Sequence, residues 1–209
     1  MKTTHINDKN QDTPWILVIE DSLTLIAMLS QALKMWGYNV QAAATGYEGI
    51  GYAKTKPIPD LIILDVQIPD LDGYEVCKVL KNKNSPLTST IPIIFLTGMH
   101  QEEKRRQGFD VGCDDYLVKP IQPEILRVTI ERLLNKRKKD KKKLGQLKNE
   151  VLALLSRVSE SVDALDRMID FQIANKTFNP KEMQEQVKEV KLLLEQLADK
   201  GIENIMRRF

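Results

Sequence analysis

The fold is decided by the stretch LIILDVQIPDLDGYEVC, which runs from Leu61 to Cys77. Four apolar residues lead directly to Asp65, and a proline and an Asp-Gly pair follow. An uninterrupted apolar run of this length is typical of a buried strand in a parallel sheet, because helices cover both faces of such a sheet. Open α/β sheets bind their ligands at the carboxyl ends of their strands. Asp65 is therefore predicted to lie at that edge, as a metal ligand, a nucleophile or both.

Strands and helices are predicted to alternate along the first two-thirds of the chain. The expected strands are residues 15–19, 38–43, 61–65, 92–96 and 115–118. The expected helices are residues 22–36, a helix from residue 45, residues 72–83, residues 101–107 and a helix from residue 123. Ser22 is a typical N-cap, and Pro123 is at the favoured first position of its helix. The alternation predicts an α/β domain with a flavodoxin-like, doubly wound, five-stranded parallel sheet.

The composition, with 42% hydrophobic and 29% charged residues, is that of a globular protein. No apolar stretch approaches the roughly 20 residues that a membrane span needs. The polar N-terminus lacks the apolar core of a secretory signal. We therefore expect a cytoplasmic protein in which Cys77 and Cys113 are reduced thiols.

The distribution of charge indicates two parts. Residues 1–135 carry 14 basic and 17 acidic side chains, a net charge of −3, whereas residues 136–209 carry 17 and 12, a net charge of +5. Most of the basic excess lies in the run KRKKDKKK. We expect four regions, which are a disordered leader (1–13), the α/β domain (14–135), a basic linker (136–143) and a helical region (144–209).

Carboxylates cluster at the predicted strand ends. Glu20 and Asp21 follow the first strand, and Asp65 ends the third. Three carboxylates at one sheet edge raise one another's pKa values unless a cation lies among them. Mg²⁺ prefers such hard oxygen ligands. We expect Asp21 and Asp65 to be direct ligands, Glu20 to act through water, and the backbone carbonyl of Gln67 to supply a further ligand.

The same edge has groups suited to phosphoryl transfer. An aspartate can form a covalent acyl phosphate, and Asp65 is the candidate nucleophile. Phosphoryl transfer mainly requires positioning and charge stabilisation. Lys119 offers a cation, Thr97 a hydroxyl and Gly98 an unobstructed backbone N–H, each for one phosphoryl oxygen.

The motifs IED, LDVQIPDLDG, LTG and YLVKP together resemble the receiver domain of bacterial two-component response regulators, over about residues 14–135. The resemblance implies that a histidine kinase, a phosphotransfer protein or a small phosphodonor phosphorylates Asp65 while Glu20 and Asp21 hold Mg²⁺. It implies that Thr97 and Tyr116 form a switch pair, and that a cis proline, Pro120, follows the phosphate-contacting Lys119. We expect the Thr97 hydroxyl to move toward the phosphoryl group and Tyr116 to rotate into the vacated space.

The region after residue 143 has apolar residues at helical spacing. Asn175–Phe178 interrupts the pattern, and Asn179 with Pro180 restarts a helix. The pattern predicts an antiparallel helical hairpin, or coiled-coil extension. The inner face of its second helix is expected to contain Met183, Val187, Val190, Leu194, Leu197 and Ile205. Pairing of two hairpins into a four-helix bundle would bury the remaining apolar sides, so we expect a homodimer through residues 144–209. The alternative is that the hairpin folds back on its own receiver domain.

Several outputs are compatible with this arrangement. We favour association with a downstream protein target, with no dedicated enzyme beyond the receiver's own phosphoryl uptake and hydrolysis. An enzymatic output is the alternative: a hairpin phosphatase, for which Glu182 and Gln186 have suitable spacing, or a stalk leading to a catalytic domain outside this chain. A DNA-binding effector is less favoured, since no helix-turn-helix pattern is present. A phosphotransfer hairpin is excluded because the histidines of the chain are His5 and His100.

Overall fold

The computed structural model describes residues 13–98, 102–175 and 179–199. The chain divides into two compact units, Met1–Lys138 and Lys139–Phe209, and each is described by itself. The predictions for residues 1–12, His100 and Ile205 lie outside the described residues. No helix in the described ranges combines the length and apolar character that a membrane crossing requires.

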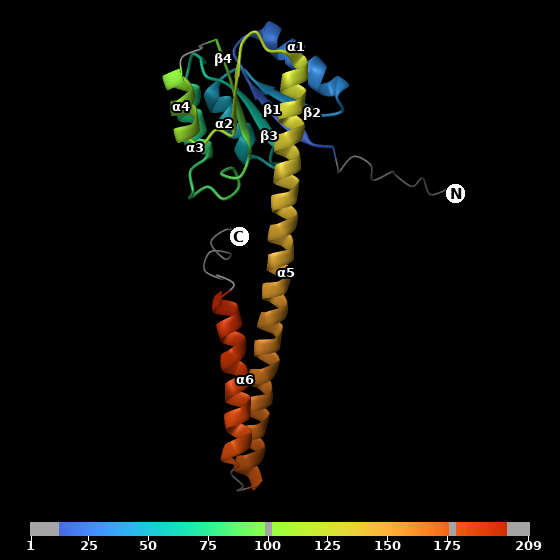
Figure 1. The fold of residues 1–209 in the computed structure, drawn as a ribbon, viewed down its shortest axis with the longest axis vertical. Helices are drawn as coiled ribbons and strands as arrows, with labels where there is room; N and C mark the ends of the chain where they lie inside the picture. The colour runs from blue at the N-terminus through green and yellow to red at the C-terminus, as the bar shows by residue number, and fades with distance from the viewer. Residues whose placement is uncertain (1–12, 99–101, 176–178, 200–209) are drawn as a thin grey trace, which may run out of the picture. The chain divides into compact units, whose positions relative to one another are not determined.

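The first unit contains one five-stranded parallel sheet (Figure 1). The strands are β1 (Trp15–Ile19), β2 (Asn39–Ala43), β3 (Leu61–Asp65), β4 (Ile93–Thr97) and β5 (Asp115–Val118). Their order is β2-β1-β3-β4-β5, so β3 is central. The flavodoxin-like fold predicted from the sequence is confirmed. Asp65 pairs with Leu96 and Thr97 with Val118, which brings the ends of these strands level at one edge.

Helices cover both faces of this sheet, which explains the continuous apolar runs. They are α1 (Leu23–Met35), α2 (Gly46–Lys54), α3 (Gly73–Leu80), α4 (Glu102–Asp110) and the start of α5 (Pro123–Asn175). Ile62 and Leu64 of β3 pack in the core with α2 and α3. Leu61 and Ile63 face the other way and pack with α1 and α5. Because successive strand residues point to opposite faces, the four positions of β3 before Asp65 must all be apolar.

One expectation is corrected at the basic run. Residues 136–143 do not separate two helices, because α5 continues through them from Pro123 to Asn175. Lys and Arg are good helix formers, and neither proline nor glycine occurs between Pro123 and Gly145. The boundary between the two compact units, Lys138/Lys139, falls within this run.

Arg137 is the last strongly held side chain of the first unit. Its Nη1 donates hydrogen bonds to the carbonyl oxygens of Pro59 (2.7 Å) and Asp60 (2.6 Å), just before β3 begins. Burial lowers the pKa of the guanidinium, and its Nε is buried without a hydrogen-bond partner. The second residue of the basic run is therefore docked on the α/β domain.

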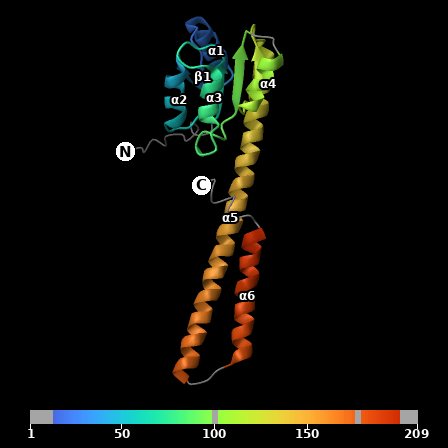
Figure 2. The ribbon, with the colours of Figure 1, turned by 90° about the vertical axis from the view of Figure 1, so that its left-hand side faces the viewer.

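The second unit pairs α5 with α6 (Pro180–Asp199), and the two helices lie side by side in both ribbon views (Figure 1, Figure 2). Val151 packs with Leu197, and Leu147, Leu154 and Val158 lie against this pair. The C-terminal helical region is thus confirmed, but part of its predicted inner face is wrong. Leu193 is 1% exposed, whereas Leu194 is 50% exposed and Val187 36%. The buried face follows the steps Val190, Leu193 and Leu197, of three and four residues, and a stripe through residues 187 and 194 is rotated away from it.

Replacing Arg137 by Met should lower the free energy of unfolding by about 1–3 kcal/mol, because the carbonyls of Pro59 and Asp60 lose their donor while the apolar stem is kept. Urea unfolding measures this change. The matched control is Lys136→Met at the exposed neighbouring position, which should change stability by less than about 0.5 kcal/mol. Equal stabilities for the two variants would contradict the docking role of Arg137.

Candidate functional site

The predicted site residues meet at the carboxyl edge of the sheet. Glu20 directly follows β1, Asp65 ends β3, Thr97 ends β4 and Lys119 directly follows β5. Glu20, Asp65 and Thr97 are buried, with exposed fractions of 1%, 4% and 0%. Parallel strands alone place these groups together, since all their carboxyl ends project to one side.

Lys119 connects the two buried acids. Its Nζ donates hydrogen bonds to Glu20 Oε2 at 2.7 Å and to Asp65 Oδ2 at 2.8 Å. Burial raises the pKa of Glu20 above its ordinary value, the neighbouring Asp65 adds to this, and the bond from Lys119 opposes it. Burial by itself lowers the pKa of Lys119, but the two carboxylates outweigh it and the pKa is raised. The lysine is therefore held in its charged form between the acids.

The carboxylates fit a divalent cation. Glu20, Asp21 and Asp65 each offer an oxygen within 4.8 Å of the others, and Asp21 is exposed. Lys119 compensates one of the three negative charges, so an excess of negative charge remains at the edge. A hard, oxygen-seeking ion such as Mg²⁺ suits this donor set. The backbone N–H of Gln67 donates to Asp65 Oδ1 at 3.2 Å, which orients the carboxylate. The role of the Gln67 carbonyl stays a prediction.

Thr97 and Gly98 border the acids on the β4 side. The Thr97 carbonyl accepts a hydrogen bond of 2.7 Å from the Lys119 N–H, which ties the two strand ends together. Gly98 is exposed, and a Cβ built on it would meet nothing within 4 Å. The Lys119–Pro120 peptide is cis, as the resemblance implies. A group that approached Asp65 from this side would meet a hydroxyl-bearing residue and open backbone.

Tyr116 is buried in the core. It is 7% exposed and packs edge-on against Phe95, with ring centroids 6.4 Å apart. Phe95 packs in the same way on Tyr74, at 5.2 Å. Burial raises the pKa of Tyr74, and the side-chain hydrogen bond with Tyr116 raises it further. The sequence reasoning missed Tyr74, although its place next to Gly73 at the helix start was a usable signal.

Gly73 is a second residue whose role the sequence reasoning missed. A Cβ at this position would lie 2.3 Å from the Asp65 carbonyl oxygen and 2.8 Å from the Val66 Cα. The Gly73 N–H also donates to the Val66 carbonyl, at 3.0 Å. The first turn of α3 therefore sits directly on the backbone of the Asp65 loop. From the sequence alone, the Asp-Gly pair indicates only the start of a helix.

Asp70 ties the same loop to another helix. Its carboxylate accepts hydrogen bonds from the N–H groups of Gly46 (2.8 Å) and Tyr47 (3.0 Å) at the start of α2. Desolvation raises the pKa of Asp70, but these backbone donors outweigh it and the pKa is lowered. The loop after Asp65 is thus fixed at both ends, by α2 and by α3.

Two further sets of predicted residues belong to other parts of the chain. Cys77 and Cys113 are free and buried, and burial raises the pKa of each thiol to about 12. Glu182 belongs to the N-terminal cap of α6, where its Oε2 accepts from Asn179 Nδ2 at 3.4 Å. Gln186 is half-buried. Glu182 therefore has a structural role in the cap of α6, and the role proposed for Gln186 stays a prediction.

The sequence model of one protein family matches residues 16–131, and its description is response regulator receiver domain. This range contains every residue of the carboxyl-edge site.

Curated relatives match the same region. The chain is 39% identical over 123 residues to a DNA-binding dual master transcriptional regulator, RpaA, from Synechocystis. This match covers 59% of this chain and 50% of that protein. It is 35% identical over 167 residues to a probable cyclic di-GMP phosphodiesterase from Vibrio cholerae. This match covers 79% of this chain and 36% of that protein. The chain thus spans about half or less of the length of these relatives.

Solved structures agree with the fold. The chemotaxis protein CheY4 of Vibrio cholerae has a TM-score of 0.54 and 34% identity, and covers 58% of this chain and 98% of that one. A two-component response regulator from Clostridium difficile has a TM-score of 0.54 and 29% identity, and covers 59% and 97%.

Replacing Gly73 by Ala should lower the free energy of unfolding by about 1–3 kcal/mol, because the added Cβ collides with rigid backbone rather than with a movable side chain. Chemical denaturation measures the loss. Gly51→Ala in α2 is the matched control, since nothing lies within 4 Å of its Cβ, and it should be neutral or stabilising by up to about 1 kcal/mol. A Gly73 variant as stable as the Gly51 variant would refute the close packing of α3 on the Asp65 loop.

Proposed function

The chain belongs to the response regulator receiver family, and on that premise we propose that Asp65 is its phosphoryl acceptor in a two-component system. The expected donors are a histidine kinase or phosphotransfer protein and small acyl phosphates. The Asp65 carboxylate oxygen attacks phosphorus, the bond from phosphorus to the donor's nitrogen or oxygen breaks, and the leaving group takes the electron pair.

The observation that carries this proposal is the double hydrogen bond from Lys119 to Glu20 and Asp65. An ammonium group 2.8 Å from the acceptor oxygen is placed to contact a phosphoryl oxygen once one is attached. Glu20, Asp21 and Asp65 would hold Mg²⁺, which when bound neutralises charge on the transferred group. Thr97 and the Gly98 N–H supply donors on the other side.

The switch is proposed to couple Thr97 to Tyr116. Phosphorylation adds a charge of about −1.5 to −2 at the edge and attracts the Thr97 hydroxyl. Tyr116 then rotates into the vacated space, which changes its edge-on contact with Phe95. Because Phe95 also packs on Tyr74, rearrangement of one ring shifts the support of the others. The surface near β4 and β5 would carry the change.

The output is proposed to be protein association through the helical region, as a homodimer through residues 144–209 that acts on a downstream protein target. The support is the apolar surface that the two-helix unit leaves uncovered. Leu152, Leu155, Val162, Leu192 and Leu194 are each at least 40% exposed. Two helices cannot bury every apolar side of both, and a second pair can.

An enzymatic output is the second candidate, and one observation favours it. The match to the cyclic di-GMP phosphodiesterase covers 79% of this chain, so it continues beyond residue 131 into α5. Under this second proposal, α5 connects the receiver domain to a catalytic domain outside this chain. The match to the DNA-binding regulator covers 59% of the chain and gives the helical region no such support.

Asp65→Asn should abolish the uptake of radiolabel from acetyl phosphate in the presence of Mg²⁺, because the amide cannot act as the nucleophile. Chelation of the metal should abolish labelling of the wild type. The control is Asp110→Asn at an exposed position of α4, which should label like the wild type. Stoichiometric labelling of the Asp65 variant would refute the assignment of the acceptor.

The mass of the full chain in solution, by sedimentation velocity with and without Mg²⁺ and beryllofluoride, tests association. A dimer is expected, because burial of the exposed apolar residues of the hairpin favours pairing. A dimer that requires beryllofluoride indicates a switch, and a constitutive dimer indicates a scaffold. A monomer at all concentrations and in both states would refute the association output.

A further inference from the structure

We call the buried face between α5 and α6 the seam. It contains Val151, Leu154 and Val158 of α5 and Met183, Val190, Leu193 and Leu197 of α6. Beside the seam, each helix has a second apolar stripe. Leu155 and Val162 of α5 are 42% and 40% exposed, and Val187 and Leu194 of α6 are 36% and 50% exposed. Each pair is separated by seven residues, or two helical turns, so its members lie on one side of their helix. Each residue also follows a seam position by four residues, as Leu155 follows the buried Val151. In an antiparallel pair, stripes with the same offset lie on the same side, so the four residues form one face.

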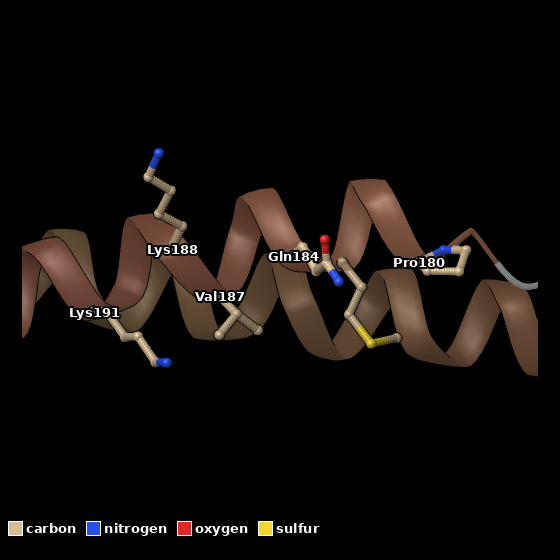
Figure 3. A pocket seen from close by; sticks show the side chains of 6 residues that line it. Pro180, Gln184, Val187, Lys188 and Lys191 are labelled. Atoms are coloured by element: carbon tan, nitrogen blue, oxygen red, sulfur yellow. The ribbon is translucent and has the colours of Figure 1, made fainter.

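Lysines border the α6 half of this face. A groove of about 430 Å³ is lined by Pro180, Met183, Gln184, Val187, Lys188 and Lys191, all from α6 (Figure 3). Lys188 and Lys191 are exposed and lie next to Val187 on the side away from the seam. The apolar floor of the groove therefore has a positive border.

Aspartates border the α5 half. Asp163, Asp166 and Asp170 are exposed and follow Val162 by one, four and eight residues, again on the side away from the seam. Within the described part of the chain, none of these aspartates and neither Lys188 nor Lys191 forms an ion pair. Beside Val162 the face thus carries negative charge, and beside Val187 it carries positive charge. Lys148 of α5 and Glu195 of α6 lie on the same sides farther along their helices.

We propose that this face binds a second copy of the chain, with α5 of one copy against α6 of the other. The proposal rests on the association output and specifies its geometry. A two-fold axis parallel to the helices keeps each residue at its own level along the hairpin. Because Val151 packs with Leu197, Asp163 of one copy then lies within about one helical turn of the level of Lys188 of the other copy, and this contact forms twice. An axis perpendicular to the helices would instead oppose α5 to α5 and α6 to α6. Where that axis passes at the level of the aspartates, it sets Asp163, Asp166 and Asp170 against the same residues of the other copy. The contact between Asp163 and Lys188 therefore favours the first arrangement.

The test uses two charge-reversal variants of the full chain. Lys188→Glu with Lys191→Glu, and Asp163→Lys with Asp166→Lys, should each raise the Kd of the dimer at least about tenfold, because like charges then meet at both contacts. An equimolar mixture of the two variants should restore dimerisation, since both contacts of the mixed dimer again pair opposite charges. Sedimentation equilibrium gives the Kd values, and circular dichroism checks that each variant keeps its helical content.

The matched control is Lys142→Glu with Lys143→Glu, which changes net charge equally but lies before Leu147, the first α5 residue of the packed seam. It should dimerise like the wild type. If the wild type dimerises and both face variants do so equally well, this face assignment is overturned while the association output stands. If the single variants are unaffected and their mixture binds more tightly, like helices pair and the assignment is again overturned. A wild type that is monomeric throughout overturns both.

Discussion

The contact on which the site depends is the bridge from the Lys119 ammonium to Glu20 and Asp65. Buried carboxylates are costly unless they are paired and hydrogen-bonded. Since β5 is two strands away from β3 in the sheet, the Lys119 side chain has to reach across the end of β4. The hydrogen bond from the Lys119 N–H to the Thr97 carbonyl fixes the position of the lysine backbone. The charge balance of the site therefore depends on the order of the strands and on where each strand ends.

That constraint made much of the first unit predictable from the sequence. Apolar runs that end in Glu20, Asp65, Thr97 and Lys119 indicate parallel strands whose ends converge, and the structure brings these residues together. The ring contact of Tyr116 with Phe95 and the contact of Gly73 with the Asp65 carbonyl were not predictable in the same way. They depend on how α3 packs over the loop, which periodicity does not encode.

The helical region shows the opposite balance. The spacing of apolar residues correctly predicts that this region is helical. It does not predict which side of α6 is buried, because positions 193 and 194 are both leucine. The second helix selects the seam, and the other stripe is left on the surface. The basic run was likewise ambiguous, since lysines suit a linker and a helix equally, and the absence of glycine and proline decided for the helix.

The central claim is that the carboxyl edge of the sheet is one cation-dependent site. An Mg²⁺ titration followed by amide chemical shifts in ¹⁵N-labelled protein tests it most directly. The account predicts that the amides next to Glu20, Asp65 and Lys119 shift together, with a common dissociation constant. Shifts scattered over the surface, or none at these three strand ends, would contradict it.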